Sequence, residues 1–346
     1  MELCVRYYMF FEANPSYISR VLEYFVTFIH HEHPKVKLRS WYLFQRFVKH
    51  VRSHLGNIAE TVLRALADLL PIKAEVPPES SEKDDEDGSS STDGQSANAR
   101  FTSQLYLYEI AGCIASVRAV PVNEQVVLIR SILDPLFSDM ETHIDAARSG
   151  IKQACLQIHH LIMALGTVAR GFSDWVPGQA TSHSSAPADA VSQEFSRASE
   201  AILLSLERLK MTFEIREAGR FAFSRLIGVL GNRILIQLAR WIDGLLTADS
   251  TKDEIALFMR LLDQVVYGFK TEIYDILNSL LSPLLERVFR GIGEATTGTD
   301  DEIQLAELKR EYLAFLSVIL NNSLESVLVS EGEHSSLRER GDRNHC

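Results

Sequence analysis

The segment HPKVKLRSWYLFQRFVKHVRSHLGNIAETVLRALADLL, residues 33–70, decides how the rest of the chain is interpreted. Its large apolar side chains recur at steps of three and four residues, which is the period of an α-helix with one buried face. This apolar stripe consists of Trp41, Phe44, Phe47, Val48, Val51 and Leu55. Pro34 stands where the helix would begin, and proline is tolerated there because the first turn has no use for its missing N–H. The segment therefore predicts a helix over 35–53 with an aromatic core face.

The same helical period continues along most of the chain, and strict alternation of apolar and polar residues is almost absent. We expect helices at 15–31, 35–53, 55–70, 99–118, 122–141, 143–171, 190–211, 215–229, 232–247, 251–267, 270–291 and 300–329. Helix pairs that repeat every ~35–50 residues are typical of HEAT and armadillo proteins. The predicted fold is all-α, a HEAT-type α-solenoid of paired antiparallel helices. A globular helical bundle is the alternative.

Polar, low-complexity stretches divide the expected helices. The stretch 75–99 is interpreted as a disordered acidic insertion, because residues 79–93 hold seven acids and one lysine and cannot bury enough apolar surface to order themselves. A second polar loop is expected at 175–190, and a disordered C-terminal tail at 331–346. The solenoid segment is therefore expected to cover 1–330, with the two insertions inside it.

Composition limits the possible classes of protein. Hydrophobic residues make up 46% of the 346-residue chain and charged residues 23%, with a formal net charge of −11. Four cysteines are scattered without a CxxC pair, which indicates free thiols in a reducing compartment. No run reaches the ~18–20 apolar residues that a membrane span needs, so we expect no membrane insertion.

Known catalytic patterns are missing from the sequence. His30, His31 and His33 lie close together, but neighbouring residues of a helix point in different directions, so we expect no metal site there. There is no phosphate-binding glycine loop and no GxSxG motif, and Cys155 lies among apolar neighbours. We therefore expect no enzyme activity and no cofactor.

The basic residues of the first segment form the strongest functional signal. They are spaced by four, seven, three and three residues, which places them on one side of a helix, opposite the aromatic stripe. The set is Lys35, Arg39, Arg46, Lys49 and Arg52. Such a face can hold nucleic-acid phosphates, and an ordinary solvated helix face is the alternative. A weaker basic cluster, diluted by acids, consists of Arg208, Lys210, Arg216, Arg220, Arg225, Arg233 and Arg240.

Three stretches together resemble a known family. They are PKVKLRSWYLFQRFVKHVRSHLGNIAETVLRALADLL (34–70), QLYLYEIAGCIAS (104–116) and LLDQVVYGFKTEIYDILNSLLSPLLERVF (261–289). The resemblance is to the exportin-T family of tRNA nuclear export receptors, which are importin-β-like karyopherins built of HEAT repeats. It extends to about residue 330. Because members of this family are much longer, the resemblance implies that the chain corresponds to a central piece of such a receptor.

The resemblance also implies partners and a location. A receptor of this family binds tRNA together with the GTP-bound form of Ran, contacts the Phe-Gly repeats of the nuclear pore, and acts as a monomeric carrier that shuttles between nucleus and cytoplasm. It implies Lys35, Arg39, Arg46, Lys49 and Arg52 as contacts to the tRNA backbone, and an acidic stretch as a contact to Ran. The residues proposed for Ran are Asp84, Asp85, Glu86 and Asp87. The alternative is a HEAT-repeat scaffold that binds protein partners without RNA.

Overall fold

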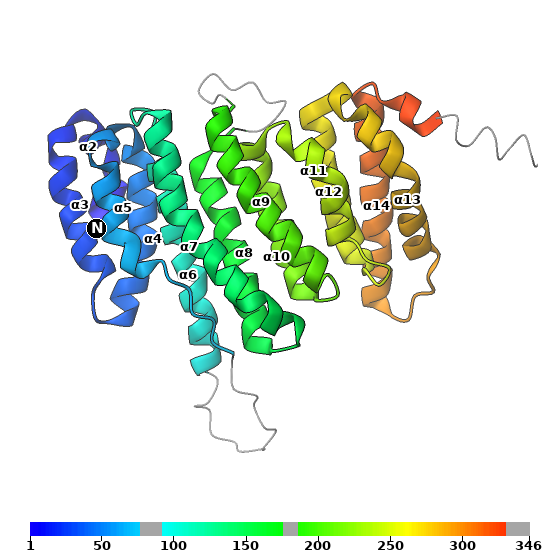
Figure 1. Cartoon of the computed structure of the whole chain (residues 1–346), viewed down its shortest axis with the longest axis horizontal. Helices are drawn as coiled ribbons and strands as arrows, with labels where there is room; N and C mark the ends of the chain where they lie inside the picture. Colours follow the sequence, from blue (N-terminus) through cyan, green and yellow to red (C-terminus); the bar gives the residue numbers. More distant parts are fainter. Residues whose placement is uncertain (77–91, 176–185, 330–346) are drawn as a thin grey trace, which may run out of the picture. The chain divides into compact units, whose positions relative to one another are not determined.

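The structure, a computed structural model, describes residues 1–76, 92–175 and 186–329 of the chain, with side chains in α6 from residue 99 onward. Over these ranges the chain forms α-helices and short 3-10 turns, and no β-strand (Figure 1). The predicted all-α fold is therefore confirmed. Within the described ranges, no helix is both long enough and apolar enough to cross a membrane.

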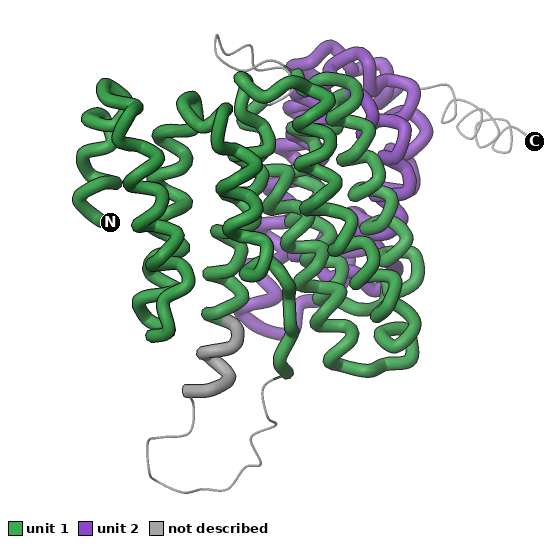
Figure 2. Tube along the Cα trace, turned by 60° about the vertical axis from the view of Figure 1, so that its left-hand side comes forward, with its two compact units in different colours: residues 1–175, 183–231 green, residues 176–182, 232–346 purple. Residues whose placement is uncertain are grey.

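The chain divides into two compact units, which are drawn in different colours in Figure 2. Unit 1 contains the described residues up to Gly231, and unit 2 those that follow it. The helices of unit 1 are α1 Glu2–Arg6, α2 Tyr8–Ala13, α3 Ile18–Ile29, α4 Pro34–Val51, α5 Ala59–Leu66, α6 Thr92–Ala115, α7 Val122–Arg148, α8 Lys152–Phe172, α9 Asp189–Leu209 and α10 Phe213–Leu230. Those of unit 2 are α11 Arg233–Leu245, α12 Lys252–Phe269, α13 Tyr274–Gly293 and α14 Thr299–Asn321.

The helices of unit 1 pack in two layers. One layer, called here the B layer, consists of α4, α6, α8 and α10, each of which packs on the next. The other layer contains α3, α5, α7 and α9. Short turns connect α7 to α8 (149–151) and α9 to α10 (210–212), while longer segments connect α5 to α6 and α8 to α9. Consecutive helices are antiparallel, and the helices of one layer run parallel. This is the arrangement of paired antiparallel helices that the sequence predicts.

The aromatic stripe of α4 forms the core at the N-terminal end of unit 1. Phe25 on α3 stacks on Phe44 and Phe47, with ring centroids 5.4 and 4.9 Å apart. The indole N–H of Trp41 donates to the backbone carbonyl of Ile29 at 3.0 Å, which satisfies the polar atom of a buried ring. Val51 is also fully buried, so α4 has one completely apolar face and presents the other to solvent.

Glycine allows α6 and α8 to approach closely. A methyl group on Gly112 would lie 2.2 Å from the carbonyl oxygen of Val168, and one on Gly171 would lie 2.1 Å from the carbonyl oxygen of Glu109. Neither distance leaves room for a Cβ atom. The two helices therefore pack backbone to backbone, and this brings side chains of α4, α6 and α8 within reach of one another.

Unit 2 is built in the same manner. α12 starts with a capping box, in which the Thr251 hydroxyl accepts from the Glu254 N–H and the Glu254 carboxylate accepts from the Thr251 N–H. Arg260 on α12 donates to Glu311 on α14 at 3.0 Å and also pairs with Glu307. These ion pairs join two helices that already share an apolar core.

Several predicted helix limits differ from the structure. α7 was expected to end at 141 but continues to Arg148, because the chain first turns at Gly150, whose φ of +85° favours glycine. α6 starts at Thr92, inside the range 75–99 assigned to the acidic insertion, so helical structure begins earlier than predicted. The short helices α1 and α2 lie before the first expected range, which begins at residue 15.

Other parts of the domain prediction lie outside the described residues. These are the central part of the acidic insertion (77–91), most of the polar loop (176–185) and the C-terminal tail with the residue before it (330–346). That residues 1–330 form one continuous solenoid segment stays a prediction, since each unit is described by itself.

Candidate nucleic-acid interface

The five predicted cations of α4 and the turn after it lie away from the aromatic core. Lys35, Arg39, Arg46 and Lys49 are exposed, and Arg52 is half-buried. The helical spacing thus places the cations as predicted. Their surroundings differ from one to the next, however, and these differences decide which of them can meet a phosphate group.

Arg39 and Arg46 lie on either side of Tyr42. Their guanidinium carbons are 5.2 and 5.9 Å from the centre of the Tyr42 ring, and Arg46 also donates to the Tyr42 hydroxyl at 3.1 Å. Arg39 forms an exposed ion pair with Glu2 at 2.8 Å, and the hydrogen bond and charge of Arg39 lower the pKa of the Glu2 carboxyl. An exposed pair of this kind contributes little to stability, so Arg39 can exchange Glu2 for another anion at small cost.

Lys49 is bound to a buried carboxylate. Its Nζ lies 2.5 Å from Oε1 of Glu109 on α6, whose side chain is only 7% exposed. Gln45 donates to the other Glu109 oxygen at 3.0 Å, and Arg170 on α8 approaches Oε1 at 3.5 Å. Glu109 therefore connects α4, α6 and α8, and the Lys49 side chain, still 40% exposed, is held at the surface of the B layer.

Arg52 connects three helices through hydrogen bonds. Its guanidinium donates to the hydroxyl of Ser116 at the end of α6 and, at 2.9 Å, to the carbonyl of Phe172, the last residue of α8. It also lies 3.5 Å from Asp174. The bond to the Phe172 carbonyl satisfies a helix-end group that has no donor within its own helix. Arg52 is thus mainly a structural residue of unit 1.

Lys35 and Arg46 are the two predicted cations with no acidic partner within the described part of the chain. Arg46 has a basic neighbour in His50. Burial, and then the charge of Arg46, lower the pKa of His50. His50 itself stacks on Tyr8 with ring centroids 3.7 Å apart. The structure therefore separates the predicted set into exposed cations that an anion can reach and cations that already serve the fold.

The remaining predicted sites are placed as follows. Asp84, Asp85, Glu86 and Asp87, the residues proposed for Ran, lie outside the described residues. His30 lies near the Val26 carbonyl and Asp68, at 2.8 and 3.1 Å. Over the described ranges, no group of three or more His, Cys, Asp or Glu side chains is arranged to hold a metal ion.

The weaker basic cluster does not form one face. Arg216 and Arg220 are buried, with their guanidinium carbons 6.0 and 5.7 Å from the Phe213 ring. Arg208 lies 3.8 Å from Asp145. Arg225 is different, because it lies near Arg170 and Glu109. Sequence spacing alone could not identify Glu109 or Arg170, since they meet Lys49 only through the packing of three helices.

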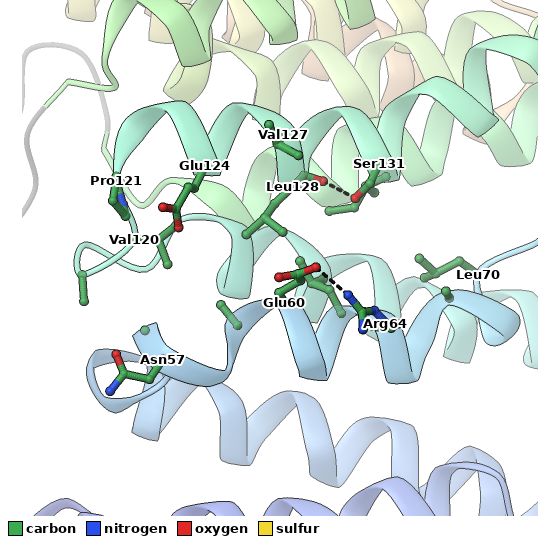
Figure 3. A pocket seen from close by; sticks show the side chains of 16 residues that line it. Asn57, Glu60, Arg64, Leu70, Val120, Pro121, Glu124, Val127, Leu128 and Ser131 are labelled. Carbon is green, nitrogen blue, oxygen red and sulfur yellow. Dashed lines mark hydrogen bonds and ion pairs between the residues drawn. The ribbon is translucent and has the colours of Figure 1, made fainter.

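An apolar groove lies between α5 and α7, in the other layer of unit 1 (Figure 3). Its volume is about 710 Å³. Figure 3 shows Leu128 on α7 pointing toward α5, with the exposed ion pair of Glu60 and Arg64 along the rim. The apolar lining residues include Leu63, Leu70, Val120, Val127 and Ile132.

Comparison with known proteins identifies the family. The family model Exportin-T matches residues 1–339. Proteins named Exportin-T are similar to the chain at 56% identity in Botryotinia fuckeliana, 59% in Aspergillus niger and 58% in Neurospora crassa. The matches cover 96%, 96% and 95% of this chain and 32% of each relative, so the chain spans about a third of their length. With a family model that covers nearly all of its residues, the chain belongs to the exportin-T family.

Proposed function

We propose that this chain is part of a tRNA nuclear export receptor and that it binds the tRNA backbone through exposed cations of α4. The observation that carries this proposal is the division of α4 into a buried aromatic face and a cationic outer face on which Lys35 and Arg46 have no acidic partner in the described chain. Membership of the exportin-T family supports the same function. The carrier shuttles between nucleus and cytoplasm and binds its cargo together with GTP-bound Ran.

The cationic face of α4 is suited to a phosphate backbone. A-form RNA presents its phosphates and 2′-hydroxyl groups at the surface, while its deep major groove hides the base edges from side chains. Cations that contact phosphates release condensed counterions, so affinity falls steeply as salt rises. Arg39 and Arg46 are steadied by Tyr42, which reduces the conformational freedom that binding would remove.

The experiment is fluorescence anisotropy of labelled tRNA over a salt series, with and without GTP-loaded Ran. The test variant reverses Lys35 and Arg46 to glutamate. The control variant reverses Arg20 and Arg64, which are exposed on other helices of unit 1, so both variants change the net charge equally. Lys49 is left unchanged because a glutamate there would face the buried carboxylate of Glu109.

We expect the Lys35→Glu, Arg46→Glu variant to lower affinity for all tRNAs about equally. The slope of log K against log salt concentration should become shallower by roughly two, since each lost phosphate contact removes about 0.9 from it. The control variant should leave the slope nearly unchanged. Equal affinities for the two variants, both folded, would refute α4 as the RNA-binding face. Binding that increases with GTP-loaded Ran would support a carrier; binding indifferent to Ran would contradict that part of the proposal.

The groove between α5 and α7 supports the proposed contact with Phe-Gly repeats. Its apolar lining and volume of about 710 Å³ can accept a phenylalanine side chain. Val127 lines the groove and is 64% exposed, whereas Val122 is exposed on the same helix but does not line it. Val127→Glu should therefore weaken binding to an immobilised Phe-Gly peptide, and Val122→Glu should not. Equal retention of the two variants on the immobilised peptide would exclude this groove as the binding site for Phe-Gly repeats.

A further inference from the structure

Two arginines extend the basic surface of the B layer beyond α4. Arg170 lies in the last turn of α8, and Arg225 lies on α10. α8 and α10 approach closely one turn earlier, where a methyl group on Gly166 would lie 2.8 Å from the Cα atom of Ala222. Because the two helices run parallel, this contact places Arg170 and Arg225 beside each other on the same layer.

In the described part of the chain, the groups that hold Arg225 in place are neutral. Its guanidinium donates to the Phe221 carbonyl at 2.8 Å and to the Ser224 hydroxyl at 3.1 Å, and it covers the Phe221 ring at 3.3 Å. Its buried Nε has no hydrogen-bond partner in the described part of the chain. Burial, and then the like charge of Arg170, lower the pKa of Arg225 to about 10. The guanidinium is thus oriented and partly desolvated. Among the described residues no carboxylate is bonded to it, and the charge of Glu109 offsets burial and the charge of Arg170 only in part.

The carboxylates nearby are already shared among other cations. Glu109 serves Lys49 and also Arg170, and Asp174 pairs with Arg52. The buried thiol of Cys113 lies among these groups and stays neutral, because burial raises its pKa to about 11. Four cations therefore face two carboxylates at this point of the B layer, and the excess positive charge lies nearest Arg170 and Arg225.

We propose that Arg170 and Arg225, with Lys49 beside them, form an anion site that binds phosphate groups of the RNA backbone. The inference rests on the proposed function and extends the RNA path from α4 across α6 and α8 to α10. Guanidinium groups bind phosphate through two parallel N–H···O bonds, and the side chain of Arg170 is 57% exposed, so a ligand can reach it. Glu109 acts as a positioning residue that keeps Lys49 and Arg170 at the rim of the site.

The test uses two probes, inorganic tripolyphosphate measured by calorimetry and labelled tRNA measured by anisotropy. The test variant is Arg170→Gln, Arg225→Gln. The control variant is Arg20→Gln, Arg148→Gln, two exposed arginines of unit 1 with the same loss of charge. We expect the test variant to bind tripolyphosphate at least about tenfold more weakly, as loss of charge-assisted hydrogen bonds of about 1.5–3 kcal/mol implies, and the control variant to change by less than about twofold.

A conservative change separates binding from folding. Arg225→Lys keeps the charge but removes the planar fork, so it should retain part of the affinity while far-UV circular dichroism and thermal unfolding stay close to the parent. Equal tripolyphosphate affinity in the parent and in Arg170→Gln, Arg225→Gln would overturn the site. So would a loss in the control variant of the same size, because binding would then follow net charge alone.

The two proposals fail in different ways. If the parent binds tripolyphosphate through Arg170 and Arg225 but binds no tRNA, the anion site stands and the proposed function fails. If reversal of Lys35 and Arg46 abolishes tRNA binding while Arg170→Gln, Arg225→Gln leaves its affinity and salt slope intact, the proposed function stands and the anion site is wrong.

Discussion

Replacing Gly171 by alanine should destabilise unit 1 by about 3 kcal/mol. The added methyl carbon would lie 2.1 Å from the carbonyl oxygen of Glu109 and 3.1 Å from the backbone nitrogen of Cys113, whereas Cβ contacts below 3.0 Å essentially do not occur. The clash is with helix backbone, so no change of rotamer relieves it and α6 must move away from α8. Overpacking costs about 1–3 kcal/mol and sometimes more, and a backbone clash belongs at the upper end of that range.

Urea unfolding followed by far-UV circular dichroism measures the loss, and hydrogen exchange of α6 and α8 shows where it occurs. Gly293→Ala is the matched control, because nothing lies within 4 Å of its Cβ position and its backbone is not left-handed. Alanine there should be neutral or stabilise α13 by up to ~1 kcal/mol through its higher helix preference. A loss at Gly171 of less than about 0.5 kcal/mol, the size of an ordinary surface effect, would refute the close approach of α6 and α8.

Further expectations concern single side chains. Arg52→Gln removes the donors to Ser116 and the Phe172 carbonyl and should cost about 1–3 kcal/mol in urea unfolding, whereas Arg46→Gln on the same face should cost less than ~0.5 kcal/mol. Burial, and then the charge of Glu311, raise the pKa of Asp263 from 3.8 to about 6. The folded state therefore holds this proton more tightly, so the contribution of Asp263 to stability falls as pH rises from about 4 to 6. Asp263→Asn should remove this fall and stabilise unit 2 at pH 7.5 by about 1–2 kcal/mol in thermal unfolding, while the exposed Asp275→Asn should not. The Cys113 thiol, buried and with its pKa raised to about 11, should be alkylated by iodoacetamide much more slowly than Cys4 or Cys155, as peptide mass spectrometry would show; comparable rates would contradict its burial.

The predicted helices were correct wherever the apolar period was long and unbroken. The stripe from Trp41 to Val51 is buried as the spacing predicts. A helix makes one turn per 3.6 residues, so apolar residues at that period share one face, and this face packs against the core. Helix ends were less accurate. Nothing in the composition around residue 141 distinguishes a turn from the continuous helix that ends at Arg148, and Gly150 is recognisable as the turn only once its backbone angle is known.

The placement of the candidate cations was predicted in part, and their binding to RNA stays a prediction. Helical spacing correctly placed Lys35, Arg39 and Arg46 on the outer face of α4, since their directions depend only on the helix that carries them. It could not show that Arg52 bonds to the ends of α6 and α8, or that Lys49 bonds to Glu109. Those partners are more than fifty positions away in the chain, and a local period carries no information about such contacts.

The sequence by itself determined the all-α class, the pairing of helices and the separation of aromatic from cationic residues on α4, because each follows from local periodicity and the cost of exposing apolar surface. Only the tertiary structure decided which cations stay available. The backbone contact of α6 and α8 at Gly112 and Gly171 brings Lys49, Glu109 and Arg170 together, and the contact of Gly166 with Ala222 adds Arg225. Whether a charge is neutralised depends on distances between helices, and these are set by packing across the whole of unit 1.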